Sequence, residues 1–446
     1  MTSQTIGSDF TGGALLPNYV NGRLLTAEDL ATGQASLLAR DTRIGQAVGS
    51  GIVNGLWVTA AATTLTIAAG VGISPSGQAV VAPRTLTLPL NLTAANGTVN
   101  SATFSRCSGS TSGGTTTVAA GVYLLTARPV QQAQGQSPLA APPDSAMSPG
   151  CAARWTAEGV EIRAITLPAL TTVGGIAATD QNLRNLTAHW CYGTDQLADL
   201  AIHPFDFDPA YSGFDRLSPA DLTDLDVPLA VFRWTGQGVV DLDNWSARRR
   251  ITTPDPVPSP WSAAVADRRD ADGQARFLQF QDQIAQIAAS GLAGFTQAPP
   301  IFGLLPPVGF LPAEFIDSTI VSTAAPAAGT PGVATPASAA TDSVFNPWEF
   351  FDGLAWEGGT ISWADADYAL RQSWQLPPVP TVFESEGPRP LTFYWIRENR
   401  DASARPVTVV FMTDIPWAGG SRSTSASAGT GKADAPTADA PAGGAT

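Results

Sequence analysis

Apolar positions recur every seven residues near the start of the chain, and this spacing predicts a helix over about 27–46. The repeated positions and their apolar neighbours are Leu30, Leu37, Ile44, Leu38 and Val48. Thr26 precedes them as an N-cap, and Asp29 three residues later can complete a capping box. The Gly-rich stretch 49–55 ends the helix. Two interpretations fit the stripe: a helix packed on its own chain, or a helix bundled with copies of itself or with a partner.

Beyond this helix the pattern changes to short, β-branched segments separated by turn residues. These segments are predicted strands, at 63–67, 71–73, 78–81, 84–88, 121–127, 155–167, 227–232 and 239–243. Pro75-Ser76-Gly77 is a predicted hairpin turn, because Pro fixes one turn dihedral and Gly accepts a positive φ. The pattern therefore predicts small β modules after the first helix.

Helical spacing returns later, where apolar residues three or four apart predict a second helix over 272–289. Its apolar face consists of Phe277, Phe280, Ile284 and Ile287. The proline-rich run 299–312 cannot form an interior helix or a central strand, so we expect it to be extended at an edge or looped. The β-branched and aromatic segments 391–396 and 407–412 are predicted to pair as a hairpin.

Together these elements predict a mainly β, α+β fold with a few helices. We expect an elongated, multi-module chain in which the N-terminal helix precedes small sandwich-like or barrel-like β modules. The expected segments are a docking segment with the helix (1–60), a β-rich body (61–260) with a loop insertion at 131–149, a helix plus Pro-rich extended segment (261–318), a flexible linker (319–344), a Trp-rich β module (345–418) and a disordered tail (419–446). The small and polar residues of the linker and tail cannot build a core.

Charge and composition then exclude several functions. The chain has 24 Lys plus Arg against 38 Asp plus Glu, a net charge of −14, which argues against nucleic-acid binding. Its one lysine, Lys432, lies in the tail. The rest of the chain therefore lacks the lysine that Walker-type phosphate loops and Schiff-base chemistry require. No stretch approaches the ~20 apolar residues of a membrane span, and residues 1–9 lack the features of a signal peptide. We therefore expect cytoplasmic synthesis and no membrane insertion.

Reactive side chains are few, and none forms a recognisable site. His189 is one of two histidines and lies two residues from Cys191; a core position is favoured over a catalytic Cys–His pair. The acidic loop at 203–215 is favoured as incidental over a calcium site. Isolated thiols are favoured over a disulfide framework or a zinc site for Cys107, Cys151 and Cys191. We expect no catalytic, cofactor-binding or metal-binding residue.

Acidic residues among tryptophans, at 348–367, leave a carbohydrate-directed function open. Sugars stack on Trp, and glycosidases place two carboxyl groups on either side of the scissile bond. The separation that matters, about 5–10 Å, is spatial and is not a property of sequence spacing. A carbohydrate-binding or glycan-cleaving protein that uses these residues is therefore one of the candidate functions.

Several short motifs follow one another in order along the chain. Residues 18–30 read NYVNGRLLTAEDL and lead through the predicted helix to NGLWV at 54–58 and GVGISPSGQ at 70–78. This order resembles proteins encoded with phage tails and phage-tail-like contractile injection systems, among them baseplate and tail-fibre proteins. Further short motifs extend the resemblance over most of 18–412. The first helix departs from the family pattern, because it carries Ala, Gly and Thr where aromatic, His and Arg residues are typical.

The resemblance implies a structural, baseplate- or fibre-associated subunit of a contractile particle, and no enzyme. Its implied partners are other tail or baseplate proteins and copies of itself, with a cell-surface glycan or receptor as a further candidate. The candidate assembly interface is Tyr19, Leu24, Leu25, Leu30, Leu37 and Ile44. The candidate second contact surface is Trp348, Phe351, Trp356 and Trp363. After cytoplasmic synthesis the protein would join a virion-like particle; a surface protein that assembles only with itself is a third hypothesis.

Overall fold

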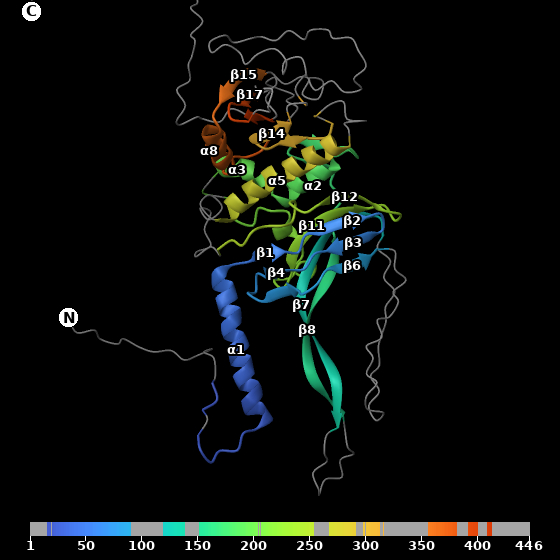
Figure 1. Ribbon diagram of the computed structural model, residues 1–446, viewed down its shortest axis with the longest axis vertical. Coiled ribbons are helices and arrows are strands. Elements are labelled where there is room, and N and C mark those ends of the chain that lie inside the picture. Colours follow the sequence, from blue (N-terminus) through green and yellow to red (C-terminus); the bar gives the residue numbers. More distant parts are fainter. Residues whose placement is uncertain are drawn as a thin grey trace, which may run out of the picture.

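The computed structural model describes residues 16–18, 20–90, 119–138, 151–203, 205, 207–253, 267–290, 298, 300–312, 315, 356–380, 391–399 and 408–412. These residues form the expected α+β fold, in which an N-terminal helix precedes several small, mostly antiparallel sheets. The molecule is elongated. Helix α1 (Ala27–Val48) and the long hairpin of β7 (Gly121–Pro138) and β8 (Cys151–Thr166) extend from the same end of the body (Figure 1).

Helix α1 begins at the predicted capping box. The Thr26 hydroxyl accepts a hydrogen bond from the Asp29 amide at 3.2 Å, and the Asp29 carboxylate accepts one from the Thr26 amide at 3.1 Å. Gly49 ends the helix at a φ of 103°, a conformation that favours glycine. Of the 22 residues of α1 only Ser36 and Gly45 are buried. The helix therefore stands in solvent over most of its length.

Two three-stranded antiparallel sheets follow α1 and form the predicted β module. They pair in the orders β1-β4-β5 and β2-β3-β6. Their strands are β1 (Gly51–Gly55), β2 (Val58–Ala61), β3 (Thr64–Ile67), β4 (Gly70–Ile73), β5 (Ala79–Ala82) and β6 (Leu86–Pro89). The predicted turn at 75–77 connects β4 to β5, which pair antiparallel. Leu56, Leu65 and Phe232 lie in one core that these sheets share with the central sheet.

The central sheet has the order β12-β11-β7-β8, where β11 is Val227–Trp234 and β12 is Val239–Asp243. Strand β11 covers β7 only as far as Ala127, whereas β8 pairs with β7 to Pro138. The loop insertion predicted at 131–149 is therefore wrong over 131–138, which continue β7. Residues 131–135 of β7 are all exposed, so no buried face imposes the alternation that predicts a strand, and the segment is held by its pairing with β8.

Short elements pack between the central sheet and the C-terminal half. They are β9 (Thr172–Val173), β10 (Ile176–Ala177), α2 (Leu183–Cys191), α3 (Thr194–Ile202) and the 3-10 turn η1 (Phe214–Arg216). Asn185 of α2 donates to the Leu304 carbonyl at 3.1 Å and accepts from the Leu304 amide at 3.0 Å. The Tyr192 hydroxyl donates to the Ala275 carbonyl at 3.2 Å. These bonds tie α2 to distant parts of the chain.

Helix α5 (Asp267–Ala289) includes the predicted second helix and packs on a four-stranded sheet of order β14-β18-β17-β15. The strands of the C-terminal half are β13 (Leu304–Leu305), β14 (Val308–Pro312), β15 (Trp356–Ile361), β16 (Val379–Pro380), β17 (Leu391–Ile396) and β18 (Thr408–Met412). The proline-rich run supplies the edge strand β14, and the predicted hairpin β17–β18 is confirmed. Strands β15 and β17 are parallel, with α8 (Trp363–Ser373) in the connection between them.

Candidate functional site

The apolar stripe of α1 faces solvent. Leu30, Leu37 and Ile44 are 53%, 58% and 63% exposed, and Val48 on the same face is also exposed. We call these four residues the α1 stripe. Scattered exposed leucines are ordinary, but apolar side chains aligned along one face mark an interaction site.

The turn before α1 adds two further apolar side chains, Leu24 and Leu25, which are both exposed. Arg23 forms an ion pair with Asp29 across this turn, at 2.5 Å. Hydrogen bonds from Thr26, together with Arg23, lower the pKa of Asp29. The turn is thereby tied to the first turn of the helix. Tyr19, the remaining member of the candidate interface, lies outside the described residues.

Two glycines hold α1 against the body. A Cβ atom on Gly45 would lie 2.0 Å from the Gly77 carbonyl oxygen, and one on Gly77 would lie 2.2 Å from the Thr42 carbonyl oxygen. The Gln46 side-chain Nε2 donates to the Ser76 carbonyl at 3.1 Å. At about 100° per residue, Gly45 lies about 80° around the helix from Leu37, Thr42 about 140° and Gln46 about 180°. The attachment therefore leaves the α1 stripe uncovered.

A second projecting feature is the outer part of the β7–β8 hairpin, which sequence reasoning missed. Past Ala127, strand β7 pairs with β8 alone, and β8 is the outer strand of its sheet. Trp155 on this part is 62% exposed, and the Arg154 guanidinium lies 5.0 Å from its ring centroid. Two-stranded ribbons are marginal alone, and their edges can pair with another strand. The alternation at 155–167 predicts a strand, but it does not indicate that the strand projects from the body.

The candidate C-terminal contact surface is described only in part. Trp348 and Phe351 lie outside the described residues, and Trp356 begins β15 with only its backbone described. Trp363 begins α8, is 51% exposed and packs on Phe310, with the ring centroids 5.8 Å apart. Of the four candidate residues, Trp363 is the one whose side-chain contacts the described part of the chain contains.

His189 and Cys191 both lie on α2 and are buried. Burial, with Arg276 nearby, lowers the pKa of His189 to about 3. Burial also raises the pKa of the Cys191 thiol, and a neutral thiol is a poor nucleophile. His189 Nδ1 instead lies 3.0 Å from the Thr194 hydroxyl. Residues two apart on a helix do not face each other, so the chemistry of a Cys–His pair has no support here.

The acidic loop uses its carboxylates on the chain itself. Asp208 accepts from the Ala210 amide at 2.9 Å, and Asp215 accepts from the Ser212 hydroxyl at 2.8 Å and from Arg268 at 2.5 Å. Asp206 lies outside the described residues. Within the described part of the chain, no group of three or more His, Cys, Asp or Glu side chains is arranged to hold a metal ion.

Asp272 is at the centre of a cluster of buried charge on α5. It accepts from Arg249 at 2.5 Å and from the Tyr211 hydroxyl at 2.8 Å. Arg276, one turn further along α5, donates to the Trp374 carbonyl at 2.9 Å. Burial lowers the pKa of Arg276 to about 10. These bonds hold α5 to the chain before it and after it, so the cluster has a structural role.

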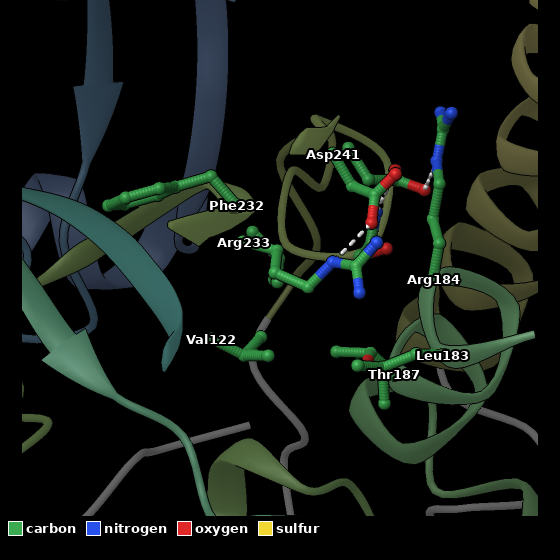
Figure 2. A pocket seen from close by; sticks show the side chains of 10 residues that line it. Val122, Leu183, Arg184, Thr187, Phe232, Arg233 and Asp241 are labelled. Atoms are coloured by element: carbon green, nitrogen blue, oxygen red, sulfur yellow. Dashed lines mark hydrogen bonds and ion pairs between the residues drawn. The ribbon is translucent and has the colours of Figure 1, made fainter. Parts of the chain in front are cut away.

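A small pocket lies between α2 and the strands β11 and β12 (Figure 2). Figure 2 shows Arg233 beside Asp241, with which it forms an ion pair at 2.7 Å. Arg184 forms a second ion pair with Asp243 at 3.4 Å. Leu183 and Val122 line it with apolar atoms. Because its charges are already neutralised in pairs, the pocket has the character of a packing gap and not of a ligand site.

Comparison with known proteins adds no identification. The chain matches no protein-family model, and no curated protein is significantly similar to it. No helix in the described ranges is long and apolar enough to cross a membrane. Function must therefore be inferred from the surfaces themselves, of which the exposed face of α1 is the best defined.

Proposed function

We propose that this chain is a structural subunit of a contractile, phage-tail-like injection particle, associated with its baseplate or its fibres. It acts by protein–protein assembly and carries out no catalysis. The observation that supports assembly is the α1 stripe, exposed along a helix that projects from the body (Figure 1). The type of particle is supported by the ordered motifs between residues 18 and 78.

Contact area makes α1 a credible docking element. The α1 stripe together with Leu24 and Leu25 exposes on the order of 700 Å², close to the ~800 Å² that each partner buries in a typical stable interface. At about 25 cal/mol per Å², covering it would contribute about 18 kcal/mol before the costs of association. The close Gly45–Gly77 contact fixes the helix in advance, which reduces the ordering that binding must supply.

Other tail or baseplate proteins and copies of this chain are the proposed partners. The chain would be made in the cytoplasm and then incorporated into the particle. A net charge of −14 would keep assembled particles apart in solution. A cell-surface glycan or receptor would belong to a second contact surface that includes Trp363.

Co-sedimentation tests this proposal. The wild-type chain should pellet with sheath and tube when particles are purified from producing cells. A Leu37→Glu, Ile44→Glu variant should stay in the soluble fraction, because two charges would interrupt the α1 stripe. Ala35→Glu is the matched control, since Ala35 is exposed on the opposite face of the same helix. Recovery of the wild-type chain only as free protein would contradict the proposal.

The carbohydrate alternative gains no support from the described residues. Trp348 lies outside them, and the side chain of Trp356 is not among those described. A glycan array with the wild-type chain and a Trp356→Ala, Glu357→Gln variant separates the two functions. A glycan signal that the variant loses would favour the alternative over assembly.

A further inference from the structure

The α1 stripe is arranged symmetrically about its middle residue. Leu37 lies seven residues after Leu30 and seven before Ile44. A second α1 running in the opposite direction, with Leu37 at the same level, places Leu37 against Leu37 and Leu30 against Ile44. Each apolar residue of one stripe then lies against an apolar residue of the other. Self-complementarity of this kind is what a two-fold interface requires.

The helix dipoles favour the antiparallel alignment, because the positive end of each helix then lies beside the negative end of the other.

We propose that α1 pairs antiparallel with α1 of a second copy of this chain, centred on Leu37. The inference rests on the proposed function insofar as α1 is the docking helix, and it names the partner. Leu24, Leu25 and the α1 stripe expose on the order of 700 Å² per copy, near the ~800 Å² per partner of a stable dimer. Gly45, where the body touches α1, lies about 80° around the helix from Leu37.

Cysteine crosslinking of the purified full-length chain tests the alignment, in a background with Cys107 and Cys151 replaced by serine. Leu37→Cys should form a disulfide dimer on oxidation. Ile44→Cys alone should not, but a mixture with Leu30→Cys should crosslink. Ala35→Cys, on the opposite face, is the control and should stay monomeric. Self-crosslinking of Ile44→Cys would overturn the antiparallel alignment whether or not Leu37→Cys also crosslinks, because a parallel pair places each of these residues beside its own copy. The absence of any crosslink would overturn the pairing itself.

Sedimentation equilibrium of the isolated chain measures the affinity. Leu37→Glu should raise the dimer dissociation constant on the order of 1000-fold, because each dimer loses two leucine contacts at its centre. Ala35→Glu should leave the constant unchanged, and circular dichroism should show equal helix content in both. A monomeric wild-type chain that still needs Leu37 to pellet with particles would overturn the dimer and keep the proposed function. A stable dimer that is absent from particles would keep the antiparallel pairing and overturn the proposed function.

Discussion

His189 allows a quantitative prediction about stability in acid. Its side chain is 2% exposed, and its Nδ1 lies 3.0 Å from the Thr194 hydroxyl. Burial first, and then Arg276, lower its pKa to about 3. The native imidazole therefore stays neutral down to about pH 3, whereas in the unfolded chain it takes up a proton below about pH 6.5. Between these values the unfolded state binds more protons, so the free energy of unfolding falls as the pH falls.

The loss in the free energy of unfolding depends on how far the pH lies below 6.5. Each pH unit below 6.5 removes about 1.4 kcal/mol, so acidification to pH 5 should remove about 2 kcal/mol through His189 alone. His189→Gln keeps a hydrogen-bonding side chain but has no proton to gain. The variant should be less stable than the wild type at pH 7.5, and it should lose about 2 kcal/mol less between pH 7.5 and pH 5.

Urea denaturation, monitored by near-UV circular dichroism, measures the free energy of unfolding of each protein at pH 7.5 and at pH 5. The loss between the two pH values is then compared between the wild type and His189→Gln. Carboxylates titrate in both proteins and cancel. His203→Gln removes the other histidine of the chain, which is exposed, and is the matched control. NMR of the imidazole provides an independent readout. A His189 resonance that titrates near pH 6.5, or equal losses in the wild type and His189→Gln, would refute the reasoning.

Three substitutions test other contacts. Gly45→Leu should detach or reorient α1, because its Cβ would lie 2.0 Å from the Gly77 carbonyl oxygen; faster proteolysis within α1 checks this, and wild-type protection would contradict it. Asp226→Asn should lower the free energy of unfolding in urea by about 3 kcal/mol, since its buried carboxylate accepts from two threonines and an arginine. Asn244→Leu should cost about 2 kcal/mol in the same assay, because it orphans the Val58 amide and carbonyl.

Elements with a local cause could be predicted from the sequence. The capping box at Thr26 and the seven-residue apolar spacing place α1 within two residues of its observed end. The Pro-Ser-Gly turn at 75–77 predicts the β4–β5 hairpin. The density of prolines predicts that 299–312 is extended at an edge or looped, and this run supplies the edge strand β14. In each case the residues that determine the structure lie within a few positions of one another.

Contacts between distant segments could not be predicted in this way. Strand β14 pairs with β18 about a hundred residues later, and β15 pairs parallel with β17 around α8. These pairings depend on the packing of α5 against the sheet, which no short window contains. Residues 131–135 of β7 are a different case, because all five side chains are exposed and such a strand needs no alternation. The Gly45–Gly77 contact likewise joins two residues that are ordinary in their own windows.

The candidate interface on α1 shows where hydrophobic periodicity stops being informative. Seven-residue spacing identifies the face of the helix that avoids water, and it is the same for a helix packed on its own chain and for one bundled with a copy. The face of α1 that contacts the body distinguishes these two cases. The body contacts α1 through Gly45 and Gln46 and leaves Leu37 and Ile44 to solvent. A helix that served only its own core would turn its leucines toward the body, so the observed orientation favours a partner outside the chain.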